Sequence, residues 1–408
     1  MNEIPSIYIY FLIIGLSAFF SALAMPRVIV IAKRKRLFDL PDNKRKIHKE
    51  VIPNLGGIGI FFTSMIIASV FIQGEQTGWW HYMVAANLIL FLVGIKDDII
   101  TLTPGKKFFA QILASVIIVF FADIRLQSLH GIFGVYELPY WISIAFSILG
   151  CIFVTNAFNL IDGIDGLAGS ISVLAVTSLG ICLALLDNIN AAYFAFALAG
   201  SIIGFLRYNL APAKIFMGDS GALYIGFSIS VLCILFCNSF TEGSLLARAI
   251  HSPSASLIIA LAILFIPIFD SFRVFITRIA KGKHPFHADK THLHHYLLDM
   301  GFSHSRTVTI LVTANLIIIC ITLMIQDYNP NIAIMAILVI TYTLFLILYY
   351  MRKNRLAKNE EMIRNVLNTN TSGDARKFKD GGSNKLSSSD LNQNAQIVIP
   401  RIAPDGGH

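Results

Sequence analysis

The feature that most constrains this chain is a series of long apolar runs between residues 7 and 351. Each run is about 20 residues long, the length at which a helix crosses the hydrocarbon of a bilayer. A soluble domain can hide one such helix but not eleven, and the mean hydropathy of +0.69 also argues against a water-soluble surface. The sequence therefore predicts an all-α integral membrane protein with about eleven transmembrane helices. The expected spans are approximately 7–26, 55–73, 80–95, 107–124, 140–158, 167–186, 191–206, 218–238, 257–277, 307–326 and 331–351.

The basic residues fall almost entirely on one side of this arrangement. Of the 32 Lys and Arg residues, all but Arg125 and Arg248 lie in the odd-numbered connections and the C-terminal tail. Basic loops stay in the cytoplasm, so the N-terminus is expected outside and the C-terminus in the cytoplasm. The formal net charge of +8 is then an orientation signal and favours contact with anionic membrane lipid. No aromatic and basic groove suggests nucleic-acid binding.

Two parts are expected along the chain: a polytopic membrane domain over residues 1–351 and a polar cytoplasmic tail over residues 352–408. The stretch 352–366 is charged, with a few apolar residues at loosely helical spacing. Beyond about residue 367 the sequence is rich in Ser, Asn, Asp, Gly and Lys. Such a segment cannot bury enough apolar surface to offset the entropy of ordering, so it is predicted to be largely disordered.

Nearly every cluster of Asp, Asn, His and Gly lies in the five cytoplasmic connections, which indicates one water-facing site on that side of the membrane. The first connection carries Lys46 and His48 and ends at a helix mouth with Gly56 and Gly57. Such glycines either let the backbone approach a ligand closely or allow tight helix packing. Both interpretations stay open from the sequence.

The second connection places Asp97 and Asp98 directly after an apolar span. Adjacent carboxylates on a soluble surface are usually only solvated. At a membrane boundary they favour a hard divalent cation such as Mg²⁺, which prefers oxygen ligands and is often shared with substrate phosphates.

The third connection contains the most informative pattern. Asn156, Asn159 and Asp162 are spaced by three, so they share a face if the helix continues through them. The pairs Asp162-Gly163 and Asp165-Gly166 are typical of tight turns. Turns alone do not explain the row of Asn side chains, so the pattern favours a functional role.

The fourth connection runs from Arg207 to Gly221 and contains Asn209, Phe216, Gly218 and Asp219. The helix that begins there offers free N–H groups and a positive dipole end to a phosphate. Asp219 is a candidate for chemistry at this point, with a plain helix N-cap as the alternative.

The fifth connection contains Arg278 and three imidazoles within four residues, His292, His294 and His295. The pattern argues against a closed zinc site, because His294 leaves the helical face that His292 and His295 share and no thiolate joins them. Side chains that hold phosphate by hydrogen bonds fit better.

Together, the five connections closely resemble the polyprenyl-phosphate N-acetylhexosamine-1-phosphate transferase family, whose relatives include the phospho-N-acetylmuramoyl-pentapeptide transferases. The likeness is ordered and covers residues 40 to 310. The motifs that carry it are Pro53-x-Leu55-Gly56-Gly57, Asp97-Asp98, Asn156-x-x-Asn159-x-x-Asp162-Gly163-x-Asp165-Gly166, Phe216-Met217-Gly218-Asp219-x-Gly221 and His292-x-His294-His295.

The resemblance implies roles for several of these residues. Asp219 resembles a Mg²⁺ ligand, Phe216 the ring that stacks on uracil, and Asp97 and Asp98 the acids assigned to the lipid phosphate and the metal. The expected site comprises three acids as catalytic and metal-binding groups, namely Asp97, Asp98 and Asp219. Its expected nucleotide contacts are Asn156, Asn159, Asp162, Asp165, Asn209, Phe216 and Gly218. Its expected phosphate or sugar contacts are Lys46, His48, Arg278, His292, His294 and His295.

The implied reaction transfers N-acetylhexosamine-1-phosphate, by preference GlcNAc-1-phosphate, from a UDP-sugar to undecaprenyl or another polyprenyl phosphate, releasing UMP. Mg²⁺ is the expected cofactor, with Mn²⁺ as a substitute, and the bacterial inner membrane is the expected location. The muramoyl-pentapeptide branch is the alternative, but it typically has three consecutive histidines where this chain has His292-Leu293-His294-His295. The donor sugar and a homodimeric state stay open.

A cation- or proton-coupled transporter is the alternative from another class. It should place acids at mid-membrane and polar residues on both faces. Only Asp270 approaches that pattern, and Arg273 one turn further on makes a structural ion pair the preferred interpretation. The gathering of acid, Asn and His clusters on one face favours the enzyme.

Overall fold

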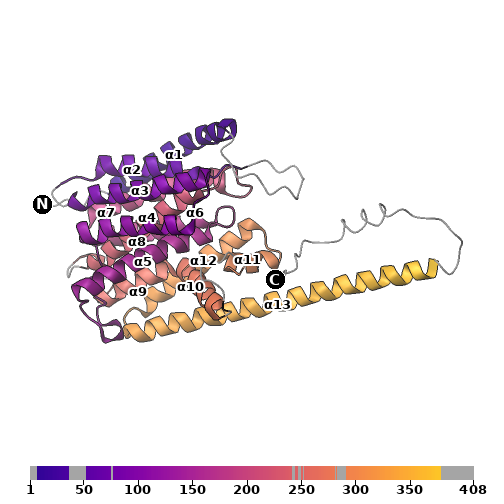
Figure 1. Cartoon of the computed structure of the whole chain (residues 1–408). Helices are drawn as coiled ribbons and strands as arrows, with labels where there is room; N and C mark the ends of the chain where they lie inside the picture. Colours follow the sequence, from indigo (N-terminus) through magenta and orange to yellow (C-terminus); the bar gives the residue numbers. More distant parts are fainter. Residues whose placement is uncertain are drawn as a thin grey trace. The chain divides into compact units, whose positions relative to one another are not determined.

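The computed structural model of the chain describes residues 7–35, 52–74, 77–240, 244–246, 250, 252–280, 282 and 291–377. These residues form helices and connecting loops, with a single isolated β-bridge between Ser128 and Glu137. The helices are α1 (Ile7–Lys35), α2 (Gly56–Phe71), α3 (Gly78–Ile99), α4 (Pro104–Val116), α5 (Tyr140–Ile161), α6 (Leu167–Leu185), α7 (Ile189–Asn209), α8 (Gly218–Asn238), α9 (Pro253–Ile263), α10 (Phe265–Ala280), α11 (Leu293–Asp299), α12 (His304–Ile325) and α13 (Pro330–Lys377), with a π-helical turn η2 (Ile117–Phe121) that continues α4 and a 3-10 turn η3 (Ile132–Gly134) (Figure 1).

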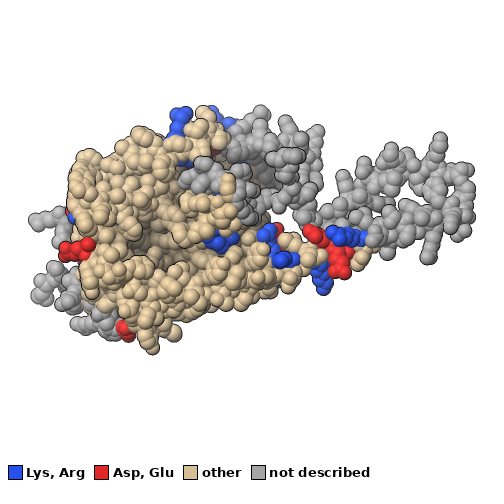
Figure 2. Space-filling model, turned by 60° about the horizontal axis from the view of Figure 1, so that its bottom comes forward, with Lys and Arg blue, Asp and Glu red and all other residues tan. Residues whose placement is uncertain are grey.

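The helices have the length and composition of membrane spans. Within the described ranges, nine are long and apolar enough to cross a bilayer, and the bent pair α9 and α10 raises the number to ten. The 16-residue α2 accounts for the remaining apolar run that the sequence indicates. The prediction of an all-α, multi-pass membrane protein is therefore confirmed. The face shown in Figure 2 is largely free of charged side chains, as contact with lipid requires.

Small residues let α1 and α7 pack closely. A Cβ atom added to Gly200 would lie 2.4 Å from the carbonyl oxygen of Ile14, and one added to Gly204 would lie 2.5 Å from that of Ala18. In a membrane the hydrophobic effect does not drive helices together, because the lipid tails are as apolar as the side chains. Close backbone approach of this kind stabilises the pair by van der Waals contact instead. The Ser21 hydroxyl adds a hydrogen bond to the carbonyl of Ser201 across the same interface.

Helix α8 is almost wholly buried and packs against α3, α5 and α6. Its N-terminus meets glycines of two other helices. A Cβ atom added to Gly94 would lie 2.4 Å from the Cα of Ser220, and one added to Gly57 would lie 2.2 Å from the backbone nitrogen of Gly221. Of the two interpretations of the first glycine motif, the structure supports tight helix packing for Gly57.

The ninth apolar run is broken. Helices α9 and α10 meet at Leu264 with a bend of 70°. Asn315 of α12 accepts a hydrogen bond from the N–H of Ile266 (3.1 Å) and donates one to the carbonyl of Ile263 (3.0 Å). A break in a membrane helix is tolerated where a neighbour satisfies the freed backbone groups, and Asn315 does this here.

The chain divides into a unit of residues 1–352 and a unit of residues 353–408. The described part of the second unit, residues 353–377, is a charged continuation of α13. Glu360 and Arg364 stand four apart in it, a spacing that supports an exposed helix. The helix thus extends about ten residues into the segment predicted to be disordered, and residues 378–408 lie outside the described part.

The orientation drawn from the basic residues stays a prediction and can be tested by cysteine labelling. Tyr136 is 70% exposed in the loop between η2 and α5, and Gly105 has open space around its Cα at the start of α4. In intact cells a membrane-impermeant thiol reagent should label Tyr136→Cys and spare Gly105→Cys until the membrane is opened. The unsubstituted chain, with its own five cysteines, sets the background. The reverse labelling would invert the orientation.

Candidate active site

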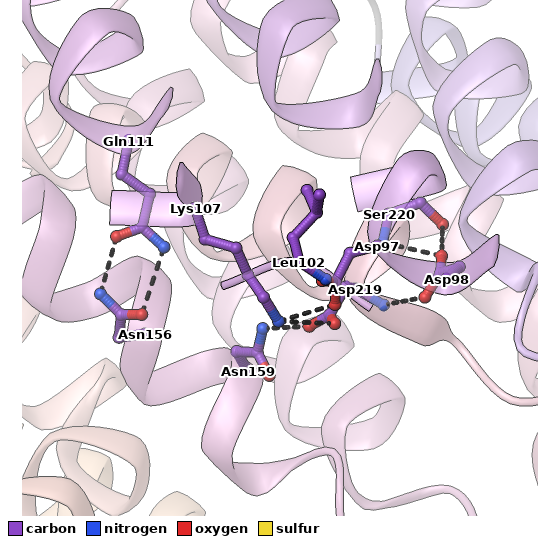
Figure 3. A network of polar contacts seen from close by, with 9 residues as sticks. All are labelled: Asp97, Asp98, Leu102, Lys107, Gln111, Asn156, Asn159, Asp219 and Ser220. Atoms are coloured by element: carbon purple, nitrogen blue, oxygen red, sulfur yellow. Dashed lines mark hydrogen bonds and ion pairs between the residues drawn. The ribbon is translucent and has the colours of Figure 1, made fainter. Parts of the chain in front are cut away.

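Asp98, near the end of α3, caps the N-terminus of α8. Its Oδ1 accepts a hydrogen bond from the N–H of Asp219 (2.7 Å), and its Oδ2 accepts bonds from the N–H (3.1 Å) and the hydroxyl (2.6 Å) of Ser220 (Figure 3). The first N–H groups of a helix have no acceptor within it, and the positive end of the helix dipole lies there. A carboxylate accepts these hydrogen bonds and is stabilised by the dipole. The cap of α8 therefore comes from α3, and the Asp219 side chain is available for other contacts.

Gly218 makes this close approach possible. Its φ of +74° lies in the left-handed region, and a Cβ atom there would lie 2.0 Å from the Asn54 carbonyl and 2.7 Å from both Asp98 carboxylate oxygens. Any side chain would push Asp98 off the helix start. Phe216, two residues earlier, is fixed by its backbone, which donates to the carbonyl of Pro53 and accepts from the N–H of Gly56, both at 2.9 Å. The Phe216 ring is half-buried.

Asp97 and Asp219 share one ammonium group. The Lys107 Nζ lies 2.7 Å from Asp97 Oδ2 and 3.0 Å from Asp219 Oδ2, and Asp97 Oδ1 accepts the N–H of Leu102 at 2.6 Å. Figure 3 shows the three side chains converging from the ends of α3, α4 and α8. Asp97 and Asp98 are adjacent in sequence but have different partners. Asp98 accepts hydrogen bonds from the start of α8, whereas Asp97 pairs with Lys107.

The two Asn residues of α5 bind different helices. The Asn159 amide donates to Asp219 Oδ1. Asn156 exchanges hydrogen bonds with the amide of Gln111 on α4, at 2.8 and 3.2 Å, and also donates to the carbonyl of Ile152. Asn159 therefore belongs to the group of acids, while Asn156 joins α4 to α5 and so places Lys107 one turn away on α4.

The turn after α5 carries two more acids. Burial, reinforced by the nearby charges of Asp219 and Asp98, raises the pKa of the Asp162 carboxyl to about 7, against a hydrogen bond from the Gly218 backbone that lowers it. Asp162 therefore adjoins the other acids. Asp165 has other partners: its Oδ2 accepts the N–H of Ala213 (3.2 Å) and lies 3.5 Å from His304 Nδ1.

Asn209 has a buried amide with two backbone partners. It accepts the N–H of Gly166 (3.0 Å) and donates to the carbonyl of Ile215 (2.9 Å). The side chain is 3% exposed and joins the third and fourth connections. In this structure Asn209 and Asp165 hold the loop 210–217 in place, which positions Phe216.

The histidine segment, residues 292–295, lies on the turn after α5. The His294 Nε2 is only 2.7 Å from where a Cβ atom would stand on Gly163. The rings of His292 and His294 are nearly parallel, with their centroids 5.7 Å apart. The ring centroid of His295 lies 4.3 Å from that of His294. Arg278 is buried near the end of α10. The other predicted phosphate contacts, Lys46 and His48, lie outside the described residues.

Burial lowers the pKa of His294 to about 3, with the positive charge of His295 adding to the effect. An unfolded chain protonates this histidine below about pH 6.5, but the folded chain does not, so acid should destabilise the fold. Between pH 7 and pH 5 the loss should be about 2 kcal/mol of unfolding free energy. His294→Gln should flatten the pH dependence of thermal unfolding in detergent, whereas the exposed control His81→Gln should not. If the unfolding temperature of the parent, His294→Gln and His81→Gln changed equally with pH, this prediction would be wrong.

The oxygen-rich group fits the Mg²⁺ that the sequence leads us to expect. Among the described residues, no three Asp, Glu, His or Cys side chains form a ready-made metal site. Mg²⁺ does not need one, because it typically takes one or two carboxylates and keeps waters or substrate phosphates as its other ligands. Asp97 and Asp219 suit this role since they already share a cation, Lys107. Asp98 suits it less because both its oxygens are engaged with α8.

Three members of the site were missing from the sequence prediction: Lys107, Gln111 and Ser220. Lys107 is the most consequential, since its ammonium group contacts both Asp97 and Asp219. It stands ten residues after Asp97, at the start of the next helix, and that position on the same side of the membrane was the available signal.

Comparison with known proteins gives a consistent result. Residues 80–237 match glycosyl transferase family 4. The chain is 34% identical over 291 residues to a probable undecaprenyl-phosphate N-acetylglucosaminyl 1-phosphate transferase of Bacillus subtilis, covering 70% of this chain and 76% of that protein. It is 32% identical to the undecaprenyl-phosphate alpha-N-acetylglucosaminyl 1-phosphate transferase of Yersinia pestis (69% and 75% covered) and 28% identical to a decaprenyl-phosphate N-acetylglucosaminephosphotransferase of Mycobacterium leprae (73% and 79% covered).

Proposed function

Because this chain belongs to glycosyl transferase family 4, among the polyprenyl-phosphate N-acetylhexosamine-1-phosphate transferases, we propose that it transfers GlcNAc-1-phosphate from UDP-GlcNAc to a polyprenyl phosphate. The names of its relatives support the sugar, since all three specify N-acetylglucosamine. They name both undecaprenyl and decaprenyl acceptors, so polyprenyl phosphate is the class proposed here.

The observation that carries the proposal is the contact of Asp97, Lys107 and Asp219 at the ends of three membrane helices. This position suits a reaction between a water-soluble diphosphate and a phosphate anchored in lipid. An oxygen of the lipid phosphate attacks the phosphorus that carries the sugar, the bond to the UMP phosphate breaks, and UMP leaves with the electron pair. One phosphoanhydride replaces another, so the equilibrium constant is near one.

The difficulty of the reaction is to bring two anions together, and the side chains of the site address it by position and charge. Lys107 supplies positive charge beside both acids, and Asn159 fixes Asp219 by its amide. When bound to Asp97 and Asp219, Mg²⁺ would offset the repulsion between the phosphates and stabilise the departing UMP. Asp98 holds the helix start that carries Asp219, and this defines a positioning role for it.

A general base is not required for the attack. A phosphate monoester has its second pKa near 6, so the acceptor is mostly dianionic at pH 7. We therefore assign Asp97 to positioning and metal binding, and a direct in-line attack is preferred over a covalent aspartyl intermediate. The backbone of Phe216 is hydrogen-bonded to Pro53 and Gly56, and its ring is half-buried. This ring is the proposed surface for the uracil.

We further propose the bacterial inner membrane as the location, with the site on the cytoplasmic face, where nucleotide sugars are made. The concentration of Lys and Arg in the connections of that face supports this orientation.

Release of UMP by the purified chain tests the proposal. With UDP-GlcNAc and undecaprenyl phosphate in detergent, UMP should form only when both substrates are present, and excess EDTA should stop it. Added Mg²⁺ should restore the rate, and Mn²⁺ should substitute. Turnover that continues in excess EDTA would remove the metal from this account, and UMP release without the lipid would indicate hydrolysis instead of transfer.

A further inference from the structure

We propose that Asp270, within the bent helix pair, is a positioning residue that orients His292 and through it places the histidine segment on the active-site turn. The inference rests on the proposed function, since its effect is on turnover. Asp270 is 2% exposed and has three partners. Its Oδ2 lies 2.9 Å from His292 Nδ1, while its Oδ1 accepts the N–H of Leu293 (3.0 Å) and a guanidinium N–H of Arg273 (2.8 Å).

Contacts with both a ring and a backbone fix the segment in two ways. Leu293 is the first residue of α11, so its N–H has no acceptor within the helix, and Asp270 accepts it. The carboxylate also accepts from the Nδ1 side of His292, so in the neutral ring the proton sits on Nδ1 and Nε2 is the acceptor. One carboxylate therefore sets where α11 begins and which nitrogen of His292 is protonated.

The orientation of His292 is transmitted toward the acids by packing. The ring of His292 is almost parallel to that of His294, which lies against Gly163. Gly163 follows Asp162 directly, and α5 ends at this turn with Asn159 holding Asp219. A rotated His292 would therefore disturb the segment that packs beside the catalytic carboxylate.

A purely structural ion pair explains Asp270 less well. Arg273 balances its charge, donates to the Thr291 carbonyl, and lies over the rings of Tyr296 and Phe345, 5.3 and 4.6 Å from their centroids. Buried ion pairs are weak sources of stability, because desolvation offsets much of the attraction. A carboxylate that also holds a histidine Nδ1 is the arrangement by which proteins fix the orientation of a ring that contacts substrate or metal.

The test is a double-mutant cycle on the full-length protein in the UMP-release assay. Asp270→Asn keeps the size of the side chain but removes its charge and one acceptor. It should lower kcat about 10- to 100-fold, the loss typical when the carboxylate partner of a metal-bound histidine is removed, with a much smaller change in KM for UDP-GlcNAc. His292→Gln should cause a loss of similar size. If Asp270 acts through His292, the double variant should be no slower than the slower single variant.

The control is Asp299→Asn, in the same helix α11, where the side chain is 39% exposed and pairs with Arg352 of α13, and it should stay within about twofold of the parent. Losses that multiply in the double variant, or an unchanged kcat for Asp270→Asn, would overturn the inference. If Asp270→Asn does not fold, the cycle uses Asp270→Glu, which keeps the charge and displaces it by one methylene, with the same criterion. An inactive parent protein would instead refute the proposed function, so the two failures are distinguishable.

Discussion

Asp219→Asn should lower kcat by at least about 100-fold, or about 2.7 kcal/mol in the activation barrier, while the protein still inserts and folds. The backbone N–H of Asp219, which binds Asp98, is unchanged by the substitution. What changes is the side chain, which loses its negative charge and one of the two oxygens that face Lys107 and Asn159. An amide is a poorer Mg²⁺ ligand than a carboxylate of the same size.

The matched control is Asp123→Asn, in a loop on the side expected to lie outside, where the side chain is 59% exposed and pairs with Arg125. It should leave turnover within about twofold of the parent. Both variants are to be compared by UMP release at saturating Mg²⁺ and by thermal unfolding. Near-normal activity of Asp219→Asn would remove this residue from the reaction and leave Asp97 as the leading metal ligand.

Lys107→Met should also lower kcat/KM by about 100-fold or more, because Asp97 and Asp219 would lose the cation they share and the phosphates would lose a positive neighbour. The chain supplies its own control in Lys106, the preceding residue on α4, which is exposed. Lys106→Met removes the same charge from the same helix turn and should have little effect. Equal losses for the two variants would show that only the net charge of this surface matters.

The apolar runs were predictable because a membrane span is a local property of about 20 consecutive residues. The structure places α5, α6 and α8 within a few residues of the expected bounds. The bend between α9 and α10 was not predicted, because it depends on Asn315 of α12, about fifty residues away in the sequence. Nothing in the apolar run itself reveals which of its carbonyls a neighbouring helix will satisfy.

In the site too, local features were predictable and long-range contacts were not. The sequence located the acids, but not the partner of each one. Asp97 and Asp98 are neighbours in the chain, and only the packing of α3 against α8 assigns one to Lys107 and the other to the helix start. Similarly, Asn156 and Asn159 share a helix face as predicted, yet Gln111 engages the first and Asp219 the second. The structural ion pair expected for Asp270 and Arg273 is present, and the contact with His292 is the added feature.

The most direct test of the central claim is to follow the phosphate that carries the sugar. UDP-GlcNAc labelled with ³²P in its β-phosphate, incubated with the purified chain, Mg²⁺ and undecaprenyl phosphate, should transfer the label to the organic phase as a lipid diphosphate sugar while unlabelled UMP remains in water. Transfer of the sugar alone would leave the label in water as UDP, and that result would contradict the account.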